Sequence, residues 1–234
     1  MTNNNNQDLQ NSHNLSREEV QEIIRQRTDR INKEFSIAFE FIKNFPKSVT
    51  FFGSARLKED SVLYKKARDL AFKISKDLGY TVLSGGGGGI MEASNRGAFE
   101  AGGQSVGLNI VLPQEQHANK YTTESIELYY FFVRKVALSF AAEAYIFFPG
   151  GFGTLDEFSE IVTLIQTKKI PRVPIILVGR DYWAHLNTFI REVLLKEYNF
   201  IHKEDMDLYQ ILDSEEEIVE IIRKAPVRAT IKVK

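Results

Sequence analysis

Residues 80–90 read YTVLSGGGGGI, where a short apolar run passes through five glycines into a helical pattern. Tyr80 to Leu83 is typical of a buried strand, and Ile90 to Ala101 is typical of a helix. Because glycine lacks a Cβ, the backbone N–H groups of such a turn can approach an anion closely at the helix N-terminus. We therefore expect a phosphate-binding loop made by Gly86, Gly87, Gly88 and Gly89. A tight turn that only lets the strand and the helix pack together is the alternative.

The spacing of these glycines limits the kind of phosphate ligand. A dinucleotide-binding G-x-G-x-x-G motif needs a glycine at its sixth position, where Ile90 stands. A P-loop needs Lys followed by Ser or Thr, and no such pair follows the glycines. The loop is therefore not typical of dinucleotide or triphosphate sites.

The same arrangement recurs further along the chain. A strand over Tyr145 to Phe148 leads into a second glycine-rich loop over Pro149 to Gly153, and a helix from Thr154 to about Lys168 follows. This helix start places Asp156 and Glu157 in the first turn, where a carboxylate gains about 0.3–1 kcal/mol from the helix dipole. We assign Asp156 to that role and expect the carboxylate of Glu157 to face a ligand.

Strands and helices alternate along most of the chain. Further strands are predicted at Val49 to Phe52, Ser105 to Leu112 and Val173 to Val178. Further helices are predicted at 61–78, 133–142, 182–197 and 214–224. This order predicts an α/β fold, Rossmann-like, with a parallel sheet between two helical layers. Ligands of such folds bind beyond the carboxyl ends of the strands, near the point where the strand order reverses, and both glycine-rich loops fall at that edge.

The N-terminal region differs in composition. Residues 1–15 are polar and of low complexity, so we expect a disordered tail. Ser16, with Glu19 three residues later, is typical of a capping box and begins a leading helix over residues 16–45 that Pro46 stops. Residues 16–234 are expected to form a single domain.

Composition excludes several classes of partner. The 234 residues carry a net charge of −1, so no global positive field attracts nucleic acid or an anionic membrane. Cysteine is absent, which excludes disulfides and thiolate sites and fits a cytoplasmic protein. No apolar run is long enough to span a bilayer, and no secretory leader is recognisable. The histidines are scattered without metal-ligand spacing, so no metal is expected; they are His13, His117, His185 and His202.

Arg134 stands where the aromatic segment Phe131 to Val133 meets the start of a helix. An arginine in this setting is commonly a surface residue whose stem covers apolar atoms. The sequence pattern by itself leaves that interpretation and a ligand-binding role both open.

Three segments together resemble the Lonely guy family of cytokinin riboside 5′-monophosphate phosphoribohydrolases, long labelled lysine decarboxylase-like. They are Ser84 to Glu92, Arg134-Lys135, and Pro149 to Glu157, and the similarity extends over Val49 to Lys224. The resemblance implies an enzyme, without cofactor, that cleaves the N-glycosidic bond of a nucleoside 5′-monophosphate to free base and ribose 5-phosphate. It also implies dimers or larger homo-oligomers.

The resemblance assigns catalysis to Arg134 and Glu157. It assigns nucleotide contacts to a larger set: Ser54, Lys135, Gly150, Gly151, Phe152, Gly153, Thr154 and Thr163. Glu115 lies near the position at which a glutamate of the family contacts substrate. The chain departs from short plant-like members in its leading helix and in residues 114–119, and the preferred base stays open.

The chemistry fits these residue types. Glycosidic cleavage passes through a ribosyl cation-like state, which a carboxylate such as Glu157 stabilises while it positions water. The planar fork of Arg134 can orient phosphate or ribose hydroxyls. One alternative is a pyridoxal phosphate-dependent decarboxylase, for which no lysine stands out. Another is a non-catalytic nucleotide-binding or carrier protein of the same fold, which needs the glycine loops but not the Arg134–Glu157 pair.

Overall fold

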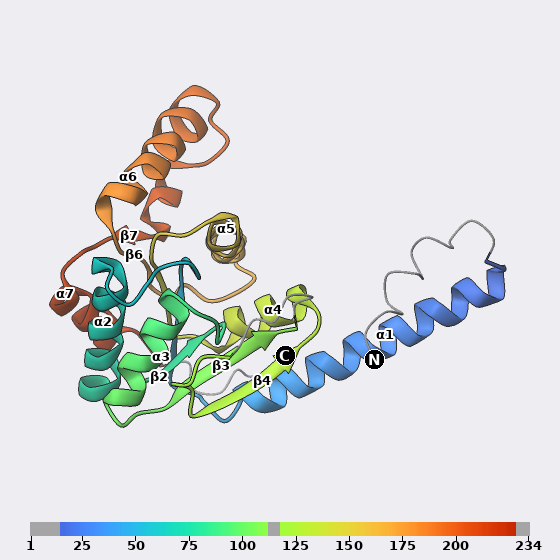
Figure 1. Ribbon diagram of the computed structural model, residues 1–234. Coiled ribbons are helices and arrows are strands. Elements are labelled where there is room, and N and C mark those ends of the chain that lie inside the picture. The colour runs from blue at the N-terminus through green and yellow to red at the C-terminus, as the bar shows by residue number, and fades with distance from the viewer. Residues whose placement is uncertain (1–14, 112–117, 228–234) are drawn as a thin grey trace.

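In the computed structural model, which describes residues 15–111 and 118–227, a seven-stranded parallel sheet forms the centre of the molecule (Figure 1). The strand order is β4-β3-β2-β1-β5-β6-β7, so the direction of winding reverses between β1 and β5. The strands are β1 (Ser48–Phe52), β2 (Thr81–Ser84), β3 (Ser105–Ile110), β4 (Glu124–Leu128), β5 (Ala144–Phe147), β6 (Ile175–Leu177) and β7 (Gln210–Ile211). This arrangement confirms the predicted fold class and puts the reversal point where the two loops after β1 and β5 begin.

Helices cover both faces of the sheet. The helices are α1 (Arg17–Ile42), α2 (Val62–Leu78), α3 (Ile90–Glu100), α4 (Phe131–Ala141), α5 (Phe152–Gln166), α6 (Arg180–Phe189) and α7 (Glu215–Lys224), with a π-helix η1 (Ile190–Glu197) and a 3-10 helix η2 (Lys203–Leu208). Side chains alternate between the faces, as Val49 and Phe51 pack with α2, α3 and α7 while Phe52 packs with α1, α4, α5 and α6. The strands therefore carry buried residues on both sides, as a parallel sheet requires.

Local sequence explains several of the helix boundaries. Ser61 caps α2 by accepting a hydrogen bond from the backbone N–H of Tyr64, and Gly79 ends it in the left-handed conformation with φ of 66°. Ser16 and Glu19 form the expected capping box at the start of α1. These boundaries agree with the predicted ones to within a few residues.

Strands β4 and β7 and the π-helix were not predicted. β4 is an edge strand with the exposed residues Glu124 and Glu127, so it lacks the apolar run by which buried strands are recognised. β7 is only two residues long. The predicted helix over 182–197 consists of α6 followed by η1, because the hydrogen bonding changes at Ile190.

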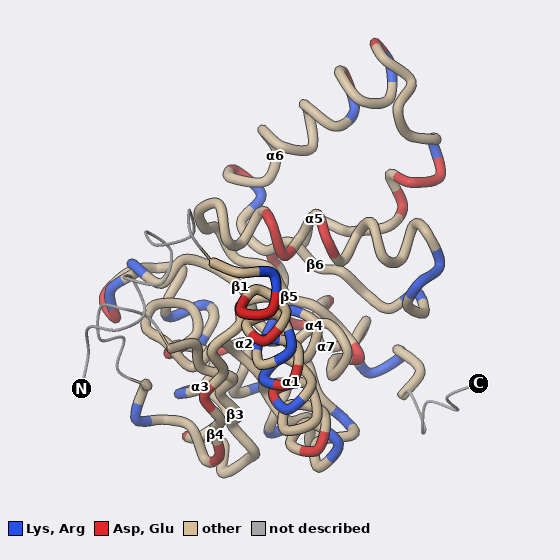
Figure 2. The backbone as a smooth tube through the Cα atoms, turned by 90° about the vertical axis from the view of Figure 1, so that its right-hand side faces the viewer, with Lys and Arg blue, Asp and Glu red and all other residues tan. Residues whose placement is uncertain are grey.

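Helix α1 projects away from the rest of the molecule (Figure 1). Its second half packs against α4, where Phe39 and Phe140 meet edge to face with ring centroids 4.9 Å apart. Its first half is exposed through residue 30, including the apolar side chains of Val20, Ile23 and Ile24. Acidic and basic residues are interspersed along it (Figure 2). No helix among residues 15–111 and 118–227 combines the length and apolar character needed to cross a membrane. The predicted tail, apart from Leu15, lies outside the described residues.

Candidate functional site

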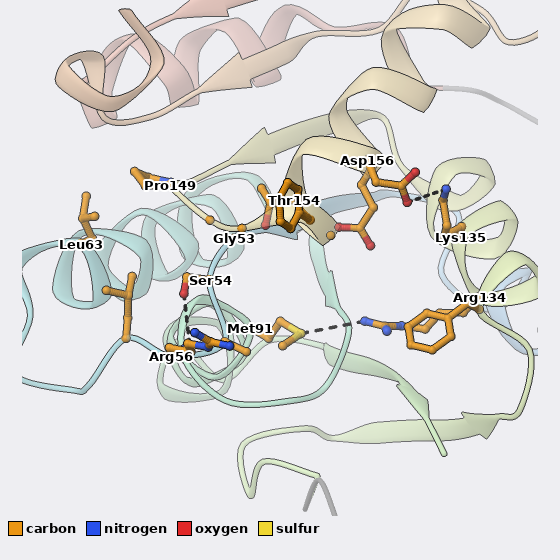
Figure 3. A pocket seen from close by; sticks show the side chains of 18 residues that line it. Gly53, Ser54, Arg56, Leu63, Met91, Arg134, Lys135, Pro149, Thr154 and Asp156 are labelled. Atoms are coloured by element: carbon orange, nitrogen blue, oxygen red, sulfur yellow. Dashed lines mark hydrogen bonds and ion pairs between the residues drawn. The ribbon is translucent and has the colours of Figure 1, made fainter. Parts of the chain in front are cut away.

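A pocket of about 830 Å³ opens at the carboxyl ends of β1 and β5, where the winding direction reverses (Figure 3). Loops after both strands, the start of α5 and the first turns of α3 and α4 supply its walls. The lining residues are Gly53, Ser54, Ala55, Arg56, Leu57, Leu63, Met91, Phe131, Arg134, Lys135, Pro149, Gly150, Gly151, Phe152, Gly153, Thr154, Asp156 and Glu157. The pocket therefore brings together Arg134, Glu157, Lys135, Ser54 and the whole second glycine-rich loop.

Ser54 joins three segments at the floor of this region. Its backbone N–H donates to the carbonyl of Pro149 at 3.0 Å, and its own carbonyl accepts from the N–H of Ile90 at 3.0 Å. Its hydroxyl accepts from the N–H of Arg56 at 3.2 Å. The loop after β1 is thus fixed to the loop after β5 and to the start of α3.

The N-terminus of α5 is open towards the pocket. Gly151 is its N-cap, and no side chain caps it. A Cβ on Gly151 or Gly153 would meet nothing within 4 Å, whereas one on Gly150 would lie 2.2 Å from the hydroxyl oxygen of Thr154. The first N–H groups of a helix have no partner within the helix and carry its positive dipole end. This end of α5 is therefore suited to a phosphate.

Helix α5 begins at Phe152 and not at the predicted Thr154, because the glycines at 151 and 153 belong to the cap and the first turn. Asp156 and Glu157 consequently lie in the second turn, and their predicted first-turn position is wrong. Asp156 is instead ion-paired with Lys135, at 2.7 Å between Oδ2 and Nζ. Phe152 is 92% exposed at the pocket rim.

Arg134 comes from the first turn of α4 and extends into the pocket towards Met91 (Figure 3). Its Nη2 lies 4.0 Å from the sulfur of Met91, and its Nε is buried without a hydrogen-bond partner among the described residues. Burial lowers the pKa of Arg134, and the negative charge of Glu157 opposes that shift. A guanidinium with unused donors that faces a pocket is suited to bind an anionic ligand.

The carboxyl group of Glu157 has a pKa well above its ordinary value. Burial raises the pKa of Glu157 to about 7, against the opposing effect of Arg134. The charge of Asp156 raises it further, and Lys135 lowers it. A carboxyl group that exchanges its proton near neutral pH is suited to general acid–base chemistry.

The first glycine-rich loop has a different environment. None of Gly86 to Gly89 is among the described residues that line the pocket. A Cβ on Gly86 would overlap the side chain of Asn109, and one on Gly89 would lie 2.2 Å from the carbonyl oxygen of Ser54. Asn119 donates to the carbonyls of Gly86 and Gly87. A Cβ on Gly86 or Gly89 therefore has no room in this structure. Phosphate binding by this loop stays a prediction.

Thr163, another expected contact residue, is not among the described residues that line the pocket. Thr163 is exposed on α5 and donates its hydroxyl to the carbonyl of Ser159 at 2.7 Å. Glu115 lies outside the described residues. The lining also includes apolar residues that were not predicted to contact a ligand, among them Met91, Phe131 and Leu63. Met91 directly follows the first helix start and Phe131 precedes Arg134, so proximity to the two motifs is the signal by which they could have been found.

A family model described as "Possible lysine decarboxylase" matches residues 91–222. A cytokinin riboside 5′-monophosphate phosphoribohydrolase of Rhodococcoides fascians is 25% identical over 158 residues, which cover 65% of this chain and 78% of that one. The cytokinin riboside 5′-monophosphate phosphoribohydrolase LOG5 of Arabidopsis thaliana is 30% identical over 155 residues, 64% of this chain and 67% of that one.

Solved structures share the fold at lower identity. The molybdenum cofactor binding protein of Rippkaea orientalis superposes with a TM-score of 0.55 at 21% identity, over 75% of this chain and 93% of that one. The molybdenum cofactor carrier protein of Chlamydomonas reinhardtii gives a TM-score of 0.55 at 19% identity, over 76% and 97% of the two chains.

Proposed function

The chain belongs to the family described as possible lysine decarboxylases, the family that its motifs resemble, and from this premise we propose that it is a nucleoside 5′-monophosphate phosphoribohydrolase. The reaction releases the free base and ribose 5-phosphate. The observation that carries the proposal is the placement of Arg134 and Glu157 in one pocket with the uncapped N-terminus of α5.

The phosphate is assigned to the start of α5. The open space at Gly151 and Gly153 lets an anion reach the helix N-terminus, which supplies backbone donors and a positive dipole end. Lys135 adds a cation in the same pocket. Affinity then depends mainly on the 5′-phosphate, and a nucleoside binds poorly.

Glu157 is assigned to the anomeric carbon. As a carboxylate it stabilises the positive charge that develops on the ribosyl ring as the bond to the base nitrogen breaks. The electron pair of that bond leaves with the base, which takes up a proton. Glu157 accepts a proton from the attacking water, whose oxygen bonds to the anomeric carbon. Arg134 holds ribose hydroxyls or phosphate oxygens through its unused donors.

The decarboxylase label implies a lysine that forms a Schiff base with pyridoxal phosphate. Lys135 is the lysine among the described lining residues. Burial lowers the pKa of Lys135, but the hydrogen bonds and negative charges of Asp156 and Glu160 have the larger combined effect, so the pKa is raised. An amine that stays protonated is a poor Schiff-base nucleophile, so these residues do not fit that cofactor.

A carrier is the second candidate function, because molybdenum cofactor binding and carrier proteins share the fold. A carrier needs an anion site but no carboxylate poised at an anomeric carbon. The altered pKa of Glu157 favours the hydrolase.

The test is incubation of the protein with AMP, isopentenyladenosine 5′-monophosphate, GMP, CMP, UMP and adenosine, with free base and ribose 5-phosphate measured by chromatography. Release of base from at least one monophosphate, and little from adenosine, supports the proposal. Tight binding of monophosphates without any release of base supports the carrier instead. Cleavage of adenosine as efficient as that of AMP contradicts the phosphate assignment.

We also propose that the protein acts as a homodimer or larger homo-oligomer. The first half of α1 exposes Val20, Ile23 and Ile24 on one face, and α4 exposes Phe132, Val136 and Phe140. Apolar surface of this kind is typical of contacts between copies of a chain.

A further inference from the structure

Gly85, the first residue after β2, directly adjoins the guanidinium of Arg134. A Cβ built on Gly85 would lie 1.9 Å from Nη2 of Arg134 and 2.6 Å from the sulfur of Met91. Atoms that are not bonded do not approach so closely, so the side chain of Arg134 occupies the space that any other residue would need. Gly85 is not among the glycines with positive φ. Steric room, and not backbone conformation, is therefore what requires a glycine at this position.

The contact matters because little else holds the guanidinium. Its Nε has no hydrogen-bond partner in the described part of the chain, and the contact of Nη2 with the thioether of Met91 is long, at 4.0 Å. No ion pair within 4.0 Å joins Arg134 to a described carboxylate. Its position is set by packing between the loop after β2 and the first turn of α3.

The loop that carries Gly85 is itself fixed. The N–H of Gly86 donates to the hydroxyl of Ser84 at 3.0 Å, and that hydroxyl donates to Oδ1 of Asn95 at 2.6 Å. The N–H of Asn119 donates to the carbonyl of Gly86 at 2.9 Å. A side chain added at residue 85 therefore displaces the arginine, because the end of a flexible side chain shifts more easily than a hydrogen-bonded backbone.

We infer that Gly85 is a positioning residue. Because it has no side chain, it leaves the space in which the guanidinium of Arg134 lies and is held in the pocket. This inference rests on the proposed function, since Arg134 acts there on the nucleotide. It gives the first glycine of the run a role distinct from phosphate binding. A displacement of about 1 Å in a catalytic group can lower the rate about 10²-fold.

The experiment compares Gly85→Ala with Gly103→Ala, a matched control. A Cβ on Gly103 would also lie 1.9 Å from a side-chain atom, the hydroxyl of Ser75, and Gly103 is likewise absent from the positive-φ glycines. Both residues lie next to a strand of the sheet, and neither is among the described residues that line the pocket. Gly85 adjoins the lining residue Arg134, whereas the atoms nearest to a Cβ on Gly103 belong to Ser75 and Ala98. We expect Gly85→Ala to lower kcat/KM for the cleaved monophosphate by about 10- to 100-fold with a Tm near that of the control. Gly103→Ala keeps kcat/KM within about twofold of the wild type.

A double variant separates positioning from a structural role. Gly85→Ala added to Arg134→Ala should lower kcat/KM no further, because the displaced group is already gone. If the loss of kcat/KM in the double variant equals the product of the losses in the two single variants, the inference is overturned. If Gly85→Ala does not fold, the double variant should fold with a Tm close to that of Arg134→Ala, because it removes the contact with the guanidinium and leaves only the end of the flexible Met91 side chain to move. A double variant as unstable as Gly85→Ala also overturns it.

The failure of this inference is distinct from failure of the proposed function. If Arg134→Ala abolishes cleavage while Gly85→Ala keeps wild-type kcat/KM, the positioning role of Gly85 is contradicted and the proposed function is not. If the wild type binds monophosphates without cleaving them, the proposed function falls, and a crystal structure of Gly85→Ala still decides the inference. A guanidinium moved by about 1 Å or more supports it, and one in the wild-type position overturns it.

Discussion

Arg134 on α4 and Glu157 on α5 face one pocket and act on each other's pKa, although no ion pair within 4.0 Å joins these two described residues. A direct ion pair would neutralise both groups and leave neither free for a ligand. Their separation leaves each charge available to a different part of a substrate, with the N-terminus of α5 beside them as a third binding element. The arrangement therefore differs from that of a structural salt bridge.

Glu157→Gln tests the carboxylate. The substitution keeps the size of the side chain but removes its charge and its capacity to accept a proton, so we expect kcat to fall about 10²–10⁴-fold. The Kd for AMP should change little, because the proposed phosphate site is the start of α5. Single-turnover base release and calorimetric titration with AMP measure the two quantities.

Asp156→Asn is the matched control for that variant. Asp156 is adjacent in sequence but largely exposed and paired with Lys135, so its loss should cost less than about 1 kcal/mol of stability and leave kcat within a few-fold. An inactive Asp156→Asn protein together with an active Glu157→Gln protein would mean that the roles of the two carboxylates are exchanged.

The pH dependence of cleavage follows from the pKa of Glu157. Burial raises this pKa to about 7, and only the ionised form stabilises a ribosyl cation or accepts a proton. We therefore expect kcat/KM to rise with pH through about 7 and then to level off. The profile is measured by base release between pH 5 and 9. A rate that is constant across this range, or that falls as pH rises through 7, contradicts the role of Glu157 as a carboxylate.

The same burial predicts a cost in stability. The folded state holds the proton of Glu157 more tightly than the unfolded chain, so this stabilisation is full below the ordinary pKa of 4.5 and is lost as pH rises through about 7. Glutamine carries no such charge. Glu157→Gln should therefore be more stable than the wild type by about 1 to 3 kcal/mol at pH 8 and nearly equal to it at pH 4.5. Urea unfolding at the two pH values measures the difference, and equal stability at pH 8 would show that the ionised group is well solvated.

The sequence predicted the parallel sheet, the position of the site at its carboxyl edge, and the arrival of Arg134 and Glu157 in one pocket. Apolar periodicity and the position of glycines relative to strands predict the sheet and the edge. The pairing of Arg134 with Glu157 was instead implied by the family resemblance. It did not predict β4, whose exposed edge position leaves it with Glu124 and Glu127 where a buried strand has apolar residues. It could not separate the two roles open to Gly86 to Gly89, since a glycine required by a packed neighbour and one required by a ligand look identical in sequence.

The start of α5 gives a prediction in which stability and binding change in opposite directions. Gly153 lies in the first turn of α5, and a Cβ on it would meet nothing within 4 Å. Alanine is a better helix former than glycine, so Gly153→Ala should raise the stability by about 0.5–1 kcal/mol. The added methyl group lies in the pocket at the helix N-terminus, so KM for AMP should rise about tenfold. Thermal unfolding and steady-state kinetics provide the two readouts, and an unchanged KM would place the phosphate elsewhere.

The exposed half of α1 is expected to contact a second copy of the chain. Ile23 and Ile24 are 50% and 58% exposed on the same apolar stripe that continues into the packed half of the helix. A helix segment without tertiary contacts is only marginally stable in water, so burial of this stripe against a second copy would stabilise it. We expect sedimentation velocity at micromolar concentration to show a dimer or larger species, and Ile23→Glu with Ile24→Glu to shift it towards the monomer. Gln26→Glu with Asn32→Asp adds the same two charges away from the stripe and should leave the assembly intact. A wild-type protein that sediments only as a monomer contradicts the proposal, as does a control pair that dissociates the assembly as fully as the isoleucine pair.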